Sequence, residues 1–293
     1  MRSLYFAIIF LITFISCKPN EKKIPTPYEL KLTELHGHRG CRGLYPENSL
    51  PAFINALKFG VDVLEMDVCV SKDNQVFVSH EPFYNPEICD GDSDLNLYNL
   101  NYSEIRKSDC GMKEHPRFPE QQKIKVYKPL LIEVIDSVER FCKRQNIKPP
   151  KFNIELKSEP NKYKYSQPEP KLFCMLVHNV LKGSGIYSRT IIQSFDPEIL
   201  KAYKKINPFV KLSLLVENDL SLIAHLKKAG LIPNIFSPYY KMVNKSVVDS
   251  CHLMGMEIIP WTVNDTAEAL RLLKLGVNAI ITDYPNRMGF VTN

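Results

Sequence analysis

The feature that most constrains the fold of this chain is a regular alternation of short apolar segments with amphipathic segments. Short apolar segments bounded by turn residues are typical of buried strands, and apolar residues at helical spacing are typical of surface helices. Strands that alternate with helices predict a parallel sheet. In the second half of the chain the predicted strands are 152–157, 190–195, 211–216, 234–238, 257–263 and 279–282, and the predicted helices are 171–181, 197–205, 220–228, 245–253 and 266–275.

The first half of the chain supplies further strand–helix units. They are a strand at 35–38, a helix that begins at Asn48-Ser49 and ends at Gly60, a strand at 63–70 with a short return at 76–79, and a helix at 130–145. If the second strand and its return count as one unit, the chain has eight units, which predicts a (β/α)₈ barrel of the TIM type. The alternative is an open doubly wound sheet, which is disfavoured because no glycine-rich phosphate loop follows a strand.

A long polar stretch at residues 81–128 interrupts this pattern after the second strand unit. It is rich in Asp, Asn, Pro and Tyr, and it is longer than the loops of compact domains usually are. We therefore predict that it forms a small inserted cap. Cys89 and Cys110 within it could form a disulfide in an exported protein, although the sequence alone leaves their pairing open.

The folded domain is expected to span residues 34–293, because the first 33 residues have a different character. Residues 1–16 combine a basic start with an apolar run that is short for a membrane span, and Cys17 follows. This is typical of a bacterial lipoprotein signal peptide, with lipid attached to Cys17 and residues 17–33 as a polar tether. An ordinary secretory signal or an N-terminal anchor helix are the alternatives. The lipoprotein interpretation predicts an exported bacterial protein held at a membrane by its lipid anchor, facing the periplasm or in the outer membrane.

The composition excludes several function classes. Apolar residues make up 44% of the chain and charged residues 24%, as in ordinary soluble domains. The net charge of +6 is mild and the lysines are scattered, so we predict no nucleic-acid binding. No Cys-x-x-Cys pair or His/Cys cluster indicates zinc. Nothing in the sequence predicts a protein partner.

Two carboxylates lie two residues apart in the predicted strand at 63–70. Because side chains alternate along a strand, Glu65 and Asp67 point to the same face. Two like charges on a buried face are costly unless a cation lies between them, and carboxylate oxygens suit Mg²⁺ or Ca²⁺. The alternative is an acidic edge strand that faces solvent. Glu155 and Lys157 repeat the same spacing in a later strand.

Two histidines follow predicted strands. His38, beside Arg39, ends the first strand, and His80 ends the return of the second. In a (β/α)₈ barrel the functional residues lie at the C-terminal ends of the strands, so these positions favour a catalytic role. Trp261, the only tryptophan, lies late in a predicted strand, where it either lines a pocket or packs in the core.

These motifs as a set resemble the glycerophosphodiester phosphodiesterase family, and the resemblance covers roughly residues 34 to 287. Each motif is weak alone, whereas their order and spacing are specific. The family usually has Asp where this chain has Glu81 and Thr where it has Ser49, and both differences keep the chemistry. The matching segments are His38-Arg39-Gly40, Pro46-Glu47-Asn48-Ser49, Glu65-Met66-Asp67-Val68, Lys72-Asp73, Val78-Ser79-His80, Ile154-Glu155-Leu156-Lys157, Gln193-Ser194-Phe195-Asp196, Trp261-Thr262-Val263-Asn264 and Thr282-Asp283-Tyr284-Pro285.

The resemblance implies hydrolysis of glycerophosphodiesters, which are deacylated phospholipids, to sn-glycerol 3-phosphate and an alcohol. On this hypothesis the two histidines act as general acid and general base, and which is which stays open. One divalent ion, Ca²⁺ or Mg²⁺, would assist the reaction. The expected roles are catalysis for His38 and His80, metal binding for Glu65, Asp67 and Glu155, and substrate binding for Arg39, Lys157 and Trp261.

Three other polar residues of the motifs are considered first for structural roles. Asn48 and Asp283 are assigned to caps and turns. Gln193 is either a contact to a ligand hydroxyl or a satisfied amide at the end of its strand.

Two further functions are compatible with this reading. A phospholipase of the C or D type on the same barrel would act on intact or lyso-lipids, and a membrane tether would favour it. A non-catalytic binding protein on this fold is expected to have lost some of the site residues, and this chain retains all of them.

Overall fold

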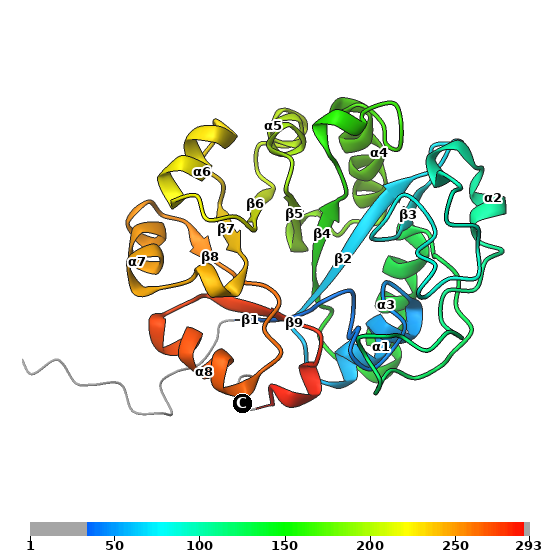
Figure 1. The fold of residues 1–293 in the computed structure, drawn as a ribbon, viewed down its shortest axis with the longest axis horizontal. Helices are drawn as coiled ribbons and strands as arrows, with labels where there is room; N and C mark the ends of the chain where they lie inside the picture. Colours follow the sequence, from blue (N-terminus) through cyan, green and yellow to red (C-terminus); the bar gives the residue numbers. More distant parts are fainter. Residues whose placement is uncertain (1–33, 290–293) are drawn as a thin grey trace, which may run out of the picture. The chain divides into compact units, whose positions relative to one another are not determined.

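The computed structural model describes residues 34–289. Eight parallel strands form a nearly closed barrel in the order β8-β7-β6-β5-β4-β2-β1-β9, and β3 pairs antiparallel with β2 outside this ring. Figure 1 looks down the barrel, with the strands forming an inner ring and the helices lying around its outside. The predicted (β/α)₈ barrel is confirmed, and the open doubly wound sheet is wrong.

The elements match the predicted ones within two residues at almost every end. The strands are β1 (Glu34–Gly37), β2 (Val63–Val70), β3 (Val76–Val78), β4 (Lys151–Leu156), β5 (Thr190–Ser194), β6 (Lys211–Val216), β7 (Ile235–Pro238), β8 (Glu257–Ile258) and β9 (Ala279–Thr282). The helices are α1 (Leu50–Lys58), α2 (Tyr102–Ile105), α3 (Leu131–Gln145), α4 (Pro170–Gly183), α5 (Pro197–Ile206), α6 (Leu222–Ala229), α7 (Lys245–Leu253) and α8 (Thr266–Leu275).

Strand β8 is much shorter than predicted. Its ladder stops at Ile258, and Pro260 follows, which has no backbone N–H to donate. Three backbone hydrogen bonds then join this segment to β9 without forming a regular ladder. They run from the N–H of Asn278 to the carbonyl of Ile258 (3.0 Å), from Ile281 to Pro260 (3.0 Å) and from Val263 to Ile281 (2.8 Å). These bonds close the seam between the first and last strands of the order.

The main core lies between the strands and the surrounding helices. Leu64, Met66 and Val68 of β2 are buried in it, so Glu65 and Asp67 point into the barrel, as the alternation predicted. The buried apolar residues of the described part run from Leu35 to Met288.

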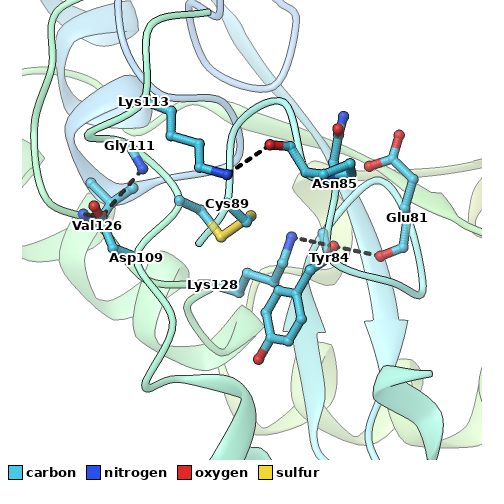
Figure 2. The surroundings of a disulfide bond; sticks show 12 residues. Glu81, Tyr84, Asn85, Cys89, Asp109, Gly111, Lys113, Val126 and Lys128 are labelled. Atoms are coloured by element: carbon cyan, nitrogen blue, oxygen red, sulfur yellow. Dashed lines mark hydrogen bonds between the residues drawn. A yellow bond between two sulfur atoms is a disulfide. The ribbon is translucent and has the colours of Figure 1, made fainter. Parts of the chain in front are cut away.

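The insertion at 81–128 has a hydrophobic core of its own, in which Phe77 of β3 packs against Tyr84 and Ile105. A disulfide joins Cys89 to Cys110, which settles the pairing that the sequence left open, and Figure 2 shows its surroundings. In Figure 1 the insertion, which contains α2, lies on one side of the barrel, next to β3.

The predicted signal peptide (1–16), the lipidation site Cys17 and the tether (17–33) lie outside the described residues. Among residues 34–289, no helix has the length and apolar character that crossing a bilayer requires.

Candidate active site

A cavity of about 470 Å³ lies at the C-terminal ends of the barrel strands. The polar groups around it come from β2, β4 and β5, from the segments that follow β1, β3, β4, β6 and β8, and from the insertion. Seven of the eight residues that the sequence assigned to catalysis, metal and substrate line this cavity, and the eighth, Asp67, is buried next to them. The seven are His38, Arg39, Glu65, His80, Glu155, Lys157 and Trp261.

Three buried carboxylates form the centre of the site. Glu65 and Asp67 lie on β2, and Glu155 pairs with Asp67 across the ladder to β4. One oxygen from each carboxylate lies within 4.8 Å of the others. Burial and the neighbouring carboxylates raise the pKa of Glu65 well above its usual range, and burial together with Asp67 raises the pKa of Glu155 to about 7.

The hydrogen bonds of these carboxylates leave room for a cation. Gln193 donates to Oε1 of Glu65 (2.8 Å), so the structure favours the satisfied-amide alternative for Gln193. Asn48 donates to Oδ2 of Asp67 (2.8 Å), whereas Oδ1 of Asp67 is buried without a hydrogen-bond partner among residues 34–289. A carboxylate oxygen that accepts no hydrogen bond, with only the ammonium of Lys157 at 4.0 Å, beside two other carboxylates is the donor set that a hard divalent ion takes. The three residues therefore fit a metal ion.

The turn after β1 requires its glycine. Arg39 has a positive φ of 48°, and its backbone N–H donates to Oε2 of Glu65 (2.8 Å). Gly40 has φ of 85°, and a Cβ added there would lie 2.6 Å from the backbone of Ala52. The motif His38-Arg39-Gly40 thus forms a turn that packs against α1 and donates a backbone hydrogen bond to Glu65.

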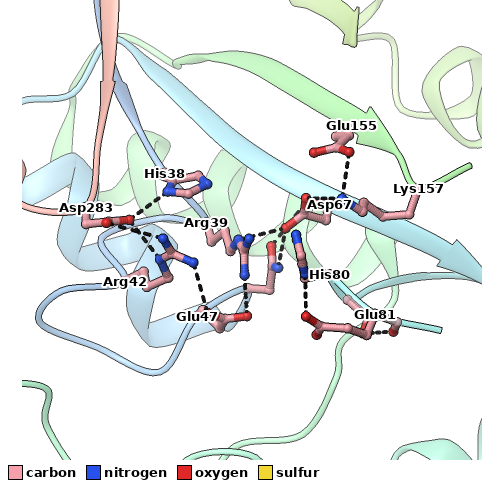
Figure 3. A network of polar contacts seen from close by, with 12 residues as sticks. His38, Arg39, Arg42, Glu47, Asp67, His80, Glu81, Glu155, Lys157 and Asp283 are labelled. Carbon is pink, nitrogen blue, oxygen red and sulfur yellow. Dashed lines mark hydrogen bonds and ion pairs between the residues drawn. The ribbon is translucent and has the colours of Figure 1, made fainter. Parts of the chain in front are cut away.

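The guanidinium of Arg39 is buried between two carboxylates. It lies 2.7 Å from Oε1 of Glu47 and 3.1 Å from Oδ2 of Asp67. Burial alone would raise the pKa of Glu47, but Arg39 and Arg42 outweigh it and lower that pKa to about 2. Arg39 therefore neutralises the acidic cluster as well as lining the cavity (Figure 3).

His38 is held by a carboxylate that the sequence reading assigned to a turn. Nδ1 of His38 lies 2.6 Å from Oδ1 of Asp283, whose two oxygens also accept from Arg42 (2.8 Å) and Asn264 (2.8 Å). Because a carboxylate only accepts, Nδ1 donates, and Nε2 is left as an acceptor 3.9 Å from Glu65. Burial and Arg42 lower the pKa of His38 to about 4.

The second histidine has a similar arrangement. Nδ1 of His80 lies 2.5 Å from Oε1 of Glu81, so this chain's Glu in place of the usual Asp still delivers a carboxylate to the ring. Burial and then Arg39 lower the pKa of His80. His80 is more exposed than His38 and borders a second pocket, which lies between the start of the insertion and the segment that follows β4.

Lys157 and Trp261 complete the lining. Nζ of Lys157 lies 2.7 Å from Glu155 and 4.0 Å from Asp67; burial would lower its pKa, but these carboxylates raise it. Trp261 donates its indole N–H to the carbonyl of Ser237 (3.0 Å). Its ring packs edge to face against Phe195, with the ring centroids 5.5 Å apart. Trp261 is thus both anchored to the barrel and part of the cavity wall.

The sequence model of the glycerophosphoryl diester phosphodiesterase family matches residues 38–287. The chain belongs to this family. A glycerophosphodiester phosphodiesterase of Bacillus altitudinis is 30% identical over 264 residues, which are 87% of this chain and 96% of that relative. A solved structure from Silicibacter pomeroyi DSS-3, described as a glycerophosphoryl diester phosphodiesterase, is 26% identical with a TM-score of 0.78, covering 88% of this chain and 92% of that one. An Oleispira antarctica phosphodiesterase, solved in complex with the product sn-glycerol-3-phosphate, has the same fold with a TM-score of 0.72 at 22% identity, covering 88% and 95%.

In this member of the family, Asn48 and Asp283, which the sequence analysis assigned to caps and turns, contact residues that it assigned to the site. Asp283 does lie in a bend directly after β9, but the sequence did not reveal that its carboxylate contacts His38 and Arg42. Asn48 also lies in a turn, with a φ of 54°, while Ser49 is the cap of α1; the sequence did not reveal that Asn48 contacts Asp67. One signal was available: Asp283 directly follows β9, at the same end of the barrel as the other site residues.

Proposed function

We propose that this protein hydrolyses glycerophosphodiesters to sn-glycerol 3-phosphate and an alcohol by metal-assisted general acid–base catalysis. Family membership supports the reaction. The observation that carries the mechanism is one cavity lined by two histidines, each held at Nδ1 by a carboxylate, beside three clustered carboxylates. In-line displacement at phosphorus needs a proton removed from one oxygen and delivered to another, and two oriented histidines meet that need.

His38 is the general base in this proposal. The proton on its Nδ1 is hydrogen-bonded to Asp283, so Nε2 carries no proton and can accept one from the attacking hydroxyl. His80 is the general acid that protonates the leaving alcohol. It lies nearer to solvent, and the carboxylate of Glu81 opposes the lowering of its pKa that burial and Arg39 cause.

Glu65, Asp67 and Glu155 would hold one divalent ion, Ca²⁺ or Mg²⁺. When bound, such an ion supplies positive charge to a phosphoryl oxygen and lowers the pKa of a hydroxyl. Gln193 and Asn48 fix the orientation of the carboxylates for this role.

Arg39 and Lys157 would bind the phosphate, since both cations line the cavity and are held in place by carboxylates. Trp261 would form the wall against the glycerol carbons. Glu81 and Arg117, which come from the insertion, line the same cavity, so the insertion would contact the alcohol.

We further propose that Cys17 carries a lipid and that residues 17–33 tether the enzyme to a bacterial membrane, facing the periplasm or in the outer membrane. The support is the sequence pattern of residues 1–17 alone.

The function is tested by release of sn-glycerol 3-phosphate from glycerophosphocholine and glycerophosphoethanolamine. The chain from Lys18 onward is assayed with Ca²⁺, Mg²⁺ or a chelator, beside His38→Ala and the control His225→Ala. His225 is buried too, but it contacts the carbonyl of Asn218 and lies outside the site cavity. Metal-dependent release that only His38→Ala abolishes supports the proposal. Release only from lysophosphatidylcholine would show a lipid-directed enzyme instead, and release unaffected by the chelator would contradict the metal site.

A further inference from the structure

Three large apolar side chains protrude at the end of the barrel opposite the site. Phe209 is 94% exposed, Ile232 is 68% exposed and Leu253 is 88% exposed. Phe209 and Ile232 lie in the connections that lead into β6 and β7, and Leu253 is the last residue of α7, shortly before β8; these three strands are neighbours in the sheet. Because the strands are parallel, these connections lie at one end of one sector of the barrel, and we call the three side chains the basal patch.

Positive charge surrounds the basal patch. The helices that end at this face carry exposed lysines in their last turns, and no carboxylate pairs with these lysines among residues 34–289. The acidic residues that begin β1 and β8 at this end are already paired, Glu34 with Lys151 and Glu257 with Lys211. Helix dipoles favour cations at these positions, but they give no reason for apolar side chains between them. The exposed lysines are Lys205, Lys227 and Lys274.

The N-terminal segment joins the barrel at this same end. β1 begins at Glu34, which lies at the N-terminal end of the barrel strands, the end that carries the basal patch. The 17 residues from Cys17 to residue 33 span about 60 Å at most when extended. A membrane that anchors the chain at Cys17 is therefore within reach of the basal patch.

We propose that the basal patch and its lysines form a membrane-docking face, which inserts into the headgroup region of an anionic bilayer. Phe, Ile and Leu would enter the boundary between headgroups and acyl chains, and the lysines would contact lipid phosphates. The catalytic cavity lies at the opposite end, so it faces the aqueous phase. This inference goes beyond the proposed hydrolysis, and it uses the lipid anchor only as support.

The test measures binding of the chain from Lys18 onward, which carries the whole described core, to vesicles of phosphatidylcholine with and without phosphatidylglycerol. The docking variant is Phe209→Ser with Leu253→Ser. The control is Met112→Ser with Ile223→Ser, which removes apolar side chains that are 53% and 57% exposed outside the basal patch. We expect binding to anionic vesicles to fall by about tenfold or more in the docking variant only, because burying one such side chain is equivalent to about that factor.

Two further measurements make the inference refutable independently of the enzyme's function. Hydrolysis of soluble glycerophosphocholine should be unchanged in the docking variant, since the substitutions lie at the far end of the barrel. Undiminished vesicle binding in that variant would overturn the inference, as would an equal loss in the control variant. Self-association by light scattering that the docking variant abolishes, without vesicle binding by the parent, would assign the patch to a second copy of the chain instead.

Discussion

Asp283→Asn isolates the carboxylate that orients His38. Oδ1 of Asp283 accepts from both His38 (2.6 Å) and Arg42 (2.8 Å), and Oδ2 accepts from Asn264 (2.8 Å) and Arg42 (3.3 Å). All of these partners are donors. An amide in either orientation therefore turns its NH₂ group toward two donors and also loses the negative charge.

The expected loss follows from one hydrogen bond to a buried charge. Such a bond contributes about 1.5–3 kcal/mol, and about 1.4 kcal/mol corresponds to a factor of ten in rate. We therefore expect kcat for glycerophosphocholine to fall by about 10- to 150-fold. KM should change little, because Asp283 does not line the cavity. If the amide presents its NH₂ to Nδ1, the imidazole adopts the opposite tautomer and the loss lies at the upper end of this range.

A matched control separates orientation of His38 from general stability. Asp196 is also buried near the end of a strand and accepts 2.6 Å hydrogen bonds from Ser158 and Tyr163, but it contacts no histidine. Asp196→Asn should lower Tm and leave kcat nearly unchanged. The reasoning is refuted if Asp283→Asn retains the parent kcat while folded, or if the two variants lose kcat equally.

Three other predictions concern the metal, the pH and the insertion. Glu155→Gln should abolish the rise in Tm that Ca²⁺ or Mg²⁺ gives the parent, and an unchanged rise would move the metal elsewhere. The pKa of Glu47 is lowered from 4.5 to about 2 in the folded protein, so its contribution of about 3 kcal/mol is present above pH 5 and is lost as pH falls toward 2. Urea unfolding should therefore show Glu47→Gln less stable than the parent at pH 7, with the gap closing toward pH 2; a pH-independent gap would exclude this linkage. Cys110→Ser opens a disulfide between residues 21 apart, which should cost about 3 kcal/mol and lower Tm, and an equal Tm for the two proteins would show that the insertion is held by its packing alone.

The sequence predicted the barrel because its pattern is local. Each strand and helix carries its own periodicity, and Ser49 and Pro51 mark the start of α1 in the sequence itself. β8 was the exception. The apolar run that continues past Pro260 has the pattern of a strand, but its backbone hydrogen bonds to β9 are separate and form no ladder.

The site was predictable where spacing or a motif marked it, and not where contacts span the chain. Glu65 and Asp67 share a face by alternation alone. Asp283 lies 245 residues from His38 in the sequence, and no pattern links the two. A short polar residue after a strand is usually a cap or a turn, so only closure of the barrel reveals the contact.

The seam beside β8 gives the molecule an intrinsic reporter. Separate backbone hydrogen bonds and the side chains of Asn264 and Asn278 join this segment to β9 without a regular ladder, so we expect the seam to open more readily in native-state fluctuations than the long ladder between β2 and β4. The single tryptophan of the chain, Trp261, lies in this segment and lines the catalytic cavity. Its fluorescence therefore reports both local opening of the barrel at the seam and ligand binding in the cavity, without an introduced label.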